Sequence, residues 1–222
     1  MSTNESRSKY HRDAEERIRQ DLEGMGFYCP ALPYHAALST DQAAVLRTRY
    51  SPTALYLRNR SDRMAIHKLL PVEFEWEVKT RESTRYDNLS LEALQLAQHV
   101  VMGQLDVRCL YIYSDPFSDF ECGFWTTALP PISCVQIPLP RWGQVTSDWY
   151  KAKLATAFPS TRILATDRSA GSNTPFALIN HADLIALPHW RTLVQSELDD
   201  STPEKFFQNN RGNLLQSAEK VV

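Results

Sequence analysis

The sequence predicts an α/β protein in which a mixed central sheet is flanked by helices. Residues 72–79 alternate strictly between apolar and charged side chains, the pattern of a strand with one buried face. Residues 107–113 form an almost continuous apolar run, which is typical of a strand covered on both faces. Residues 10–24 carry an apolar side chain at every fourth position, which predicts an amphipathic helix. The order helix, strand, strand, helix, strand indicates a sheet with helices packed on it.

The composition excludes several classes of protein. The 222 residues are 43% hydrophobic and 23% charged with a net charge of −2, as expected for a globular protein with a substantial core. The polar N-terminus predicts no signal peptide, and no apolar run approaches the roughly 20 residues needed to cross a bilayer. The four cysteines form no C-x-x-C pair, which favours reduced thiols. We therefore expect a cytoplasmic protein without a membrane partner.

The first helix ends at Gly24, and the next elements follow a short Pro-containing passage. A helix is expected over residues 40–50, with Thr40 as its N-cap. The strand-like composition of residues 53–59 predicts a strand that forms a hairpin with residues 72–79.

A further helix is expected over residues 88–102, capped by Asn88 and followed by Gly103. On that helix, a polar stripe would run beside the apolar one at positions i, i+3 and i+7, which are Glu92, Gln95 and His99. An ordinary exposed helix face explains this stripe, and His99 in particular, without any function.

Patterns beyond residue 120 are weaker. They predict a helix over residues 147–157 and strands at 120–126, 133–139, 162–164 and 176–179. The chain then divides into a flexible arm (1–9), a core (10–126), a C-terminal extension of the same domain for recognition or dimerisation (127–198), and a polar tail (199–222).

The charged face of the strand at 72–79 is the strongest indication of chemistry. It carries Glu73, Glu75, Glu77 and Lys79, and adjacent acids repel one another unless solvent or a cation separates them. A solvated face is the simplest interpretation. The alternative is a divalent cation, Mg²⁺ or Mn²⁺, held by Glu75 and Glu77. A lysine beside the acid could then orient or deprotonate an attacking water, which favours phosphodiester hydrolysis.

With Glu77-Val78-Lys79 at the end of a hydrophobic strand, between two helices and before a buried strand, residues 10–113 resemble the PD-(D/E)XK nuclease superfamily. This family includes restriction enzymes and Holliday-junction resolvases. The resemblance implies a restriction-endonuclease-like core and a Mg²⁺-dependent nuclease, with a DNA endonuclease favoured and a homodimer typical. It also implies site residues. Glu77 would bind the metal, Lys79 would contact the attacked phosphate or the water, Glu15 would support them from the first helix, and Gln95 (or Gln98) would lie near the scissile phosphate.

The pattern departs from the family at one position. The family places an Asp on the strand before Glu-x-Lys, and the expected hairpin puts Thr53 there. A hydroxyl is a poor substitute for a carboxylate as a Mg²⁺ ligand. Glu75 or Glu92 could replace it, whereas Asp62 would lie near the far end of that hairpin. The alternative is an impaired site on a nucleic-acid-binding protein or a viral or assembly structural protein.

Local charge favours nucleic acid as the partner. Between residues 45 and 70, six cationic side chains stand against the single acid Asp62. Such clusters supply salt-dependent phosphate contacts, although many are only solvated faces. The expected contacts are Arg47, Arg49, Arg58, Arg60, Arg63, Lys68, Arg81 and Arg85.

Overall fold

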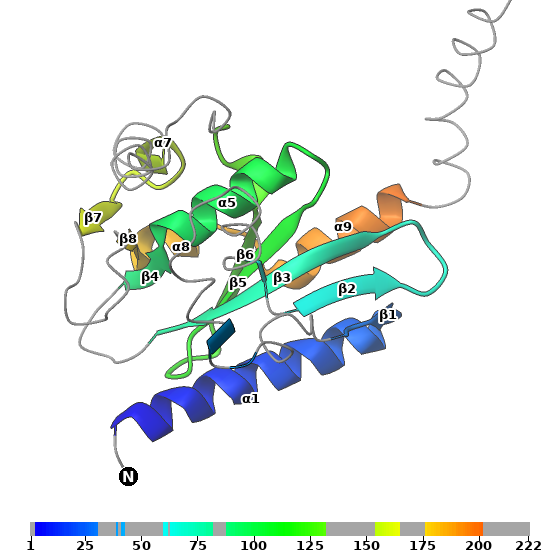
Figure 1. Cartoon of the computed structure of the whole chain (residues 1–222), viewed down its shortest axis with the longest axis horizontal. Helices are drawn as coiled ribbons and strands as arrows, with labels where there is room; N and C mark the ends of the chain where they lie inside the picture. Colours follow the sequence, from blue (N-terminus) through cyan, green and yellow to red (C-terminus); the bar gives the residue numbers. More distant parts are fainter. Residues whose placement is uncertain are drawn as a thin grey trace, which may run out of the picture.

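The computed structural model describes residues 3–30, 39, 41–42, 60–61, 63–81, 88–131, 154–164 and 176–201. These residues form an α/β protein built on a mixed five-stranded sheet with the strand order β1-β2-β3-β5-β6 (Figure 1). The strands are β1 (Phe27–Tyr28), β2 (Arg63–His67), β3 (Glu73–Thr80), β5 (Cys109–Ser114) and β6 (Glu121–Trp125). Only β3 and β5 pair in parallel among these strands. The expected fold class is confirmed, and the arrangement is consistent with a restriction-endonuclease-like core.

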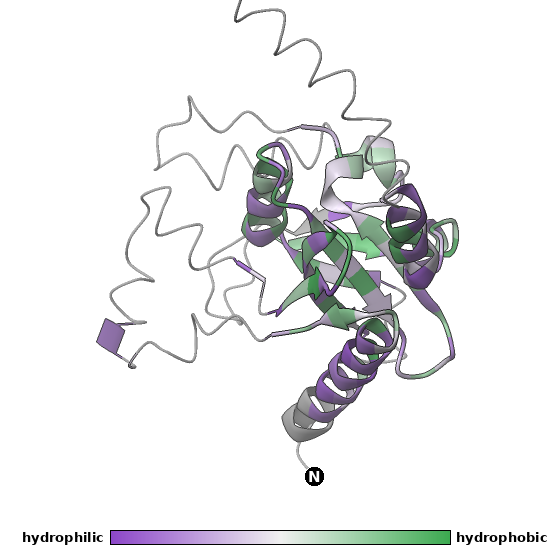
Figure 2. Ribbon diagram, turned by 90° about the vertical axis from the view of Figure 1, so that its right-hand side faces the viewer, coloured by the Kyte–Doolittle hydropathy of each residue, from purple (hydrophilic) through white to green (hydrophobic). Residues whose placement is uncertain are grey.

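Helices cover both faces of this sheet. On one face lie α1 (Thr3–Gly24) and α9 (Trp190–Asp200), whose apolar side chains share a core with the even-numbered residues of β3. On the other face lies α5 (Ala93–Gly103), which is the crossover between the parallel strands β3 and β5. Figure 2 shows hydrophobic residues concentrated on the strands and hydrophilic residues on the outward side of α1. Since α1 begins at Thr3, most of the segment expected to be a flexible arm is helical.

The alternation of β3 is confirmed. Phe74, Trp76 and Val78 are at most 4% exposed and pack toward α1, because a strand sends alternate side chains to opposite faces. Glu77 and Lys79 consequently point toward α5. The central strand β5 is buried along its whole length, as its continuous apolar run predicts.

A second, antiparallel sheet joins the core to the C-terminal extension. Its order is β4 (Asn88–Glu92), β8 (Phe176–Asn180) and β7 (Arg162–Leu164). Side chains of β4 and β8 enter the same apolar cluster as α5. The short elements η1 (Thr126–Ala128), α7 (Ala155–Ala157) and α8 (His181–Ile185) complete the described part of the chain.

The helix expected over residues 88–102 starts five residues late, and this prediction of its N-terminus was wrong. Asn88 begins β4 instead of capping a helix, because Leu89 and Leu91 are buried in a strand that pairs with β8. This period-2 pattern was too short to be separated from the helical one in sequence. Glu92 is therefore the N-cap of α5 and is not part of a polar stripe on the helix.

The expected hairpin was also assigned to the wrong strand. The antiparallel neighbour of β3 is β2, with Arg63 opposite Trp76 and Ile66 opposite Glu73. The predicted strand at 53–59 lies outside the described residues.

Of the remaining predicted elements, some are confirmed, some lie outside the described residues, and two observed helices were not predicted. The strands at 120–126, 162–164 and 176–179 are confirmed as β6, β7 and β8. Outside the described residues lie the strand at 133–139, all but residues 41–42 of the helix at 40–50, and most of the helix at 147–157. Both α8 and α9 were missed, and α9 spans the boundary expected between extension and tail. None of the helices in the described segments is long and apolar enough to cross a membrane.

Candidate active site

Three of the four predicted catalytic residues meet on the α5 side of β3. Lys79 Nζ lies 2.8 Å from Glu77 Oε1 and donates a 3.2 Å hydrogen bond to Gln95 Oε1. Gln95 Nε2 donates to the same Glu77 oxygen at 3.3 Å. Glu77 and Lys79 share a face because they are two residues apart on a strand, and Gln95 faces them from the first turn of α5. We refer to these residues as the Glu77–Lys79–Gln95 cluster.

The cluster occupies a part of the fold where ligands commonly bind. It lies in the carboxyl-terminal half of β3, next to the parallel strand β5 and under the crossover helix α5. Open α/β sheets bind their ligands outside the carboxyl ends of parallel strands. The side chains of Glu77 and Lys79 keep 12% and 22% of their surface exposed, so the cluster is largely shielded while still reaching solvent.

The electrostatics keep Glu77 ionised. Burial acts to raise the pKa of the Glu77 carboxyl, but the charge of Lys79 opposes it, aided by His99 and by hydrogen bonds from Lys79 and Gln95. The net pKa lies below the ordinary value, so the site presents a carboxylate at neutral pH.

His99 is buried between α5 and β5 and is not on an exposed helix face. It is 2% exposed, and its Nδ1 lies 2.9 Å from the hydroxyl oxygen of Tyr111. The exposed-face interpretation of His99 was therefore wrong, because α5 is covered on this side by β5.

Glu75 shares the face of Glu77 but is committed to a different partner. The Arg60 Nε donates to Glu75 Oε1 at 2.6 Å, and the Ser61 backbone N–H donates to Oε2 at 3.3 Å. Glu75 is only 3% exposed, and burial raises the pKa of its carboxyl despite the hydrogen bond from Arg60. Both oxygens thus have protein partners, which makes Glu75 a weaker candidate for a metal ligand than the sequence indicated.

Glu15 does not join the cluster. It accepts a 2.6 Å hydrogen bond from Arg63 Nε, and Arg63 is opposite Trp76 in the β2–β3 register. Directly opposed residues project from the same face of a sheet, so this pair lies on the α1 side. Glu77 and Lys79 point to the other side.

The observed β2–β3 register places the two sequence neighbours of Asp62. Ser61 donates from its hydroxyl to the Trp76 carbonyl oxygen, and Arg63 is paired with Trp76. These two neighbours of Asp62 in the sequence therefore lie beside the middle of β3. Asp62 itself, like Thr53, lies outside the described residues.

Glu77 is the described carboxylate best suited to hold a metal ion at this cluster. Mg²⁺ is held through one or two carboxylates together with water and phosphate oxygens, and the ionised Glu77 fits such a role. Within the described ranges, no group of three or more His, Cys, Asp and Glu side chains could hold a metal ion.

Most of the expected nucleic-acid contacts that can be located are ion-paired within the protein. Arg60 pairs with Glu75, Arg63 with Glu15, and Arg81 with Asp115 at 2.8 Å. Lys68 is exposed and its Nζ lies 5.0 Å from the centre of the Tyr28 ring. The cation count in the sequence thus overstated the charge that these residues offer to phosphate. Arg47, Arg49, Arg58 and Arg85 lie outside the described residues.

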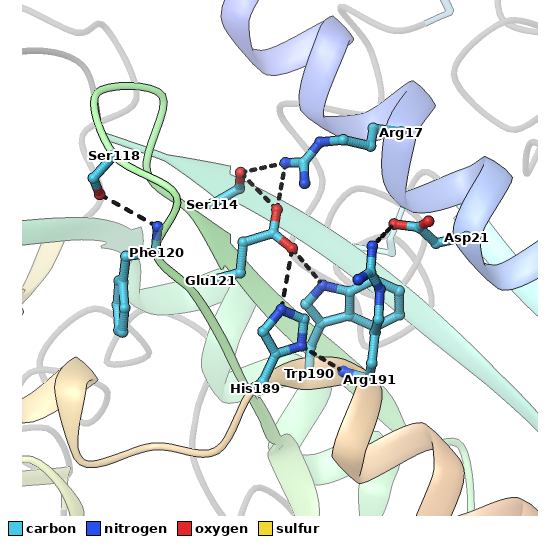
Figure 3. Close-up of polar contacts among 9 residues, drawn as sticks. All are labelled: Arg17, Asp21, Ser114, Ser118, Phe120, Glu121, His189, Trp190 and Arg191. Atoms are coloured by element: carbon cyan, nitrogen blue, oxygen red, sulfur yellow. Dashed lines mark hydrogen bonds and ion pairs between the residues drawn. The ribbon is translucent and has the colours of Figure 1, made fainter.

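A second polar network, around Glu121 of β6, was not anticipated (Figure 3). The carboxylate accepts hydrogen bonds from Trp190 Nε1 at 2.9 Å and Ser114 Oγ at 3.1 Å, and it forms an ion pair with Arg17. Burial acts to raise the pKa of Glu121, but these hydrogen bonds and the Arg17 charge lower it overall. The network joins α1, β5, β6 and α9. A lone acid inside the apolar stretch at 120–126 was the only sequence signal for it.

We compared the chain with known proteins, and no family model, no curated protein and no solved structure matches it. The fold therefore defines the class, an α/β protein with a mixed five-stranded sheet flanked by helices. Within that class, the Glu77–Lys79–Gln95 cluster is the candidate active site.

Proposed function

We propose that this protein is a Mg²⁺-dependent nuclease that hydrolyses phosphodiester bonds, with DNA as the favoured substrate and internal cleavage as the favoured mode. The observation that carries the proposal is the Glu77–Lys79–Gln95 cluster at the carboxyl end of a strand paired in parallel. An acid and a lysine held together there supply the two charges that phosphodiester hydrolysis needs, a metal ligand and a phosphate contact.

Each residue has a distinct part in the proposed reaction. Glu77 would hold the cation together with Asp62, the acid directly before β2 in the sequence. A bound Mg²⁺ would stabilise negative charge on the attacked phosphate and activate water. The Lys79 ammonium would donate hydrogen bonds to a phosphate oxygen or orient the water. Gln95 would fix both side chains, since its amide already contacts both.

A nucleic-acid-binding protein without catalysis is the second candidate. It is favoured by one observation, namely that Glu75 is ion-paired with Arg60 and is therefore less able to help Glu77 hold a cation. In this case Lys79 would contact phosphate without any bond cleavage.

Plasmid nicking separates the two functions. Supercoiled plasmid is incubated with wild-type protein and with Lys79→Ala in Mg²⁺ or Mn²⁺, and again with a chelator. The nuclease proposal expects metal-dependent relaxation by wild type and at least about a hundredfold slower relaxation by the variant. Equal relaxation by both proteins would indicate contamination and overturn it. Binding without relaxation would favour the second candidate.

A further inference from the structure

Two exposed aromatic rings meet at the end of the sheet where β3 terminates. Tyr10 of α1 is 43% exposed and Phe117, in the turn after β5, is 42% exposed. Their ring centres are 5.9 Å apart with the planes tilted by 59°. In Figure 1 this turn reaches α1 at the end of the molecule toward which β3 and β5 both run. Among the described residues, Tyr28 is the other aromatic side chain with such exposure.

The turn that carries Phe117 is rigidly built. Asp115, 4% exposed, accepts hydrogen bonds from the Phe117 backbone N–H at 3.1 Å and from Ser118 Oγ at 2.9 Å. Arg81 donates to both carboxylate oxygens, at 3.2 and 2.8 Å. The Arg81 guanidinium carbon also lies 5.4 Å from the centre of the Phe117 ring. A turn held by these hydrogen bonds needs less ordering when a ligand binds, which favours affinity.

The setting of this aromatic pair suits a polyanion. Arg81 follows Lys79 by two residues, so the pair lies at the same end of β3 as the Glu77–Lys79–Gln95 cluster. The turn of α1 that carries Tyr10 also exposes two cations, Lys9 and Arg12, against one acid, Asp13. Aromatic faces flanked by cations are the usual means of holding single-stranded nucleic acid, with bases stacked on the rings and phosphates near the cations.

We infer that Tyr10 and Phe117 form a stacking site for unpaired bases, so that the substrate enters the candidate active site from a single-stranded region. The inference rests on the proposed function for its choice of ligand. Duplex DNA has its base faces covered by neighbouring bases and would not use the pair in this way. The site thus selects for flaps, overhangs or other single-stranded segments.

The test is binding in the absence of divalent cations, so that cleavage plays no part. Fluorescence anisotropy is measured in a chelating buffer with a labelled oligothymidylate of about a dozen nucleotides and with a blunt duplex. We expect Tyr10→Ala and Phe117→Ala each to weaken single-strand binding about tenfold, with duplex binding unchanged. Phe117→Trp should retain binding. The matched control is Tyr28→Ala, which removes a still more exposed ring near the other end of β3, since Tyr28 pairs with Ile66 and Ile66 with Glu73.

Wild-type affinity in both Ala variants, or an equal loss for single strand and duplex, would overturn the inference. No measurable single-strand binding by wild type would also overturn the inference. A protein partner would then be the remaining explanation for the exposed aromatic pair. Failure of this inference and failure of the proposed function give different results. Plasmid nicking by wild type, together with wild-type single-strand affinity in both Ala variants, would refute this inference alone. Loss of single-strand binding in those variants without any nicking by wild type would refute only the nuclease. Thermal unfolding of each variant confirms that it is folded.

Discussion

The carboxylate of Glu77 and the ammonium of Lys79 lie 2.8 Å apart on one face of a strand whose other face is apolar. The pairing lets two charges occupy a largely shielded position between a sheet and a helix. Each charge depends on the other there, because a shielded charge without a partner is costly. Gln95 contacts both members, so the pair and the helix that covers it form one unit.

Replacing Lys79 should make the protein less stable in a pH-dependent manner. In wild type the pKa of Glu77 is lowered, so its ionised form contributes stability above the ordinary carboxyl pKa, and this contribution is lost as the pH falls through the folded-state pKa. Lys79→Met leaves the carboxylate shielded and unpaired. We expect a loss of about 1–2 kcal/mol at pH 7 that shrinks on acidification, measured by urea unfolding. A loss that stays constant with pH would contradict this account of the pair.

Asp62 should matter for catalysis and Thr53 should not. The hairpin expected from sequence pointed to Thr53, whereas the observed β2–β3 pairing brings Ser61 and Arg63 beside Trp76. In the proposed reaction Asp62 would be a direct metal ligand, and removing such a ligand should cost more than the roughly 10-fold to 100-fold typical of outer-shell partners. We therefore expect Asp62→Asn to lower the plasmid cleavage rate by more than about 100-fold, with Thr53→Ala unchanged. The reverse ranking would show that the ligand was assigned to the wrong segment.

The Glu121 network should contribute more to stability than a surface ion pair. Glu121→Gln removes a buried charge that Arg17 and Trp190 contact, and we expect a loss of about 2–3 kcal/mol by urea unfolding at pH 7. Glu197→Gln is the matched control, because its pair with Arg108 is more than a quarter exposed on both sides and should contribute less than about 1 kcal/mol. Because the folded-state pKa of Glu121 is lowered, the difference from wild type should also diminish at acidic pH. Equal losses in the two variants would contradict the structural role.

Gly123 should tolerate no side chain. A Cβ atom at this position of β6 would lie 2.8 Å from Trp190 Cβ and 3.1 Å from the Tyr111 carbonyl oxygen, so α9 would be pushed off the sheet. Gly123→Ala should cost about 1–3 kcal/mol in chemical denaturation. At Gly24, nothing lies within 4 Å of the added atom, and Gly24→Ala should leave stability unchanged or slightly raised. A neutral Gly123→Ala would show that α9 packs differently.

Sequence patterns anticipated the elements whose periodicity is long and unambiguous. The alternation of β3, the apolar run of β5 and the stripe of α1 each follow from which faces are buried, and together they define the sheet. Glu77 and Lys79 could also be anticipated as neighbours, because they lie two residues apart on one strand, whereas Gln95 was expected beside them only from the family resemblance. The pairing of segments that are distant in the sequence could not be anticipated. Leu89 and Leu91 belong to a strand because β8 lies beside them, and Arg60 is neutralised because Glu75 is buried next to it.

The central claim is that Glu77 acts in catalysis and is not simply one of several acids on the strand. Its most direct test is the rate of Mg²⁺-dependent plasmid cleavage by Glu77→Gln beside Glu73→Gln. Both acids lie on the same strand and the same face, but Glu73 is exposed and lies at the far end of β3 from Lys79. The account predicts cleavage at the wild-type rate by Glu73→Gln and at least about a hundredfold loss for Glu77→Gln. Equal rates in the two variants would contradict it.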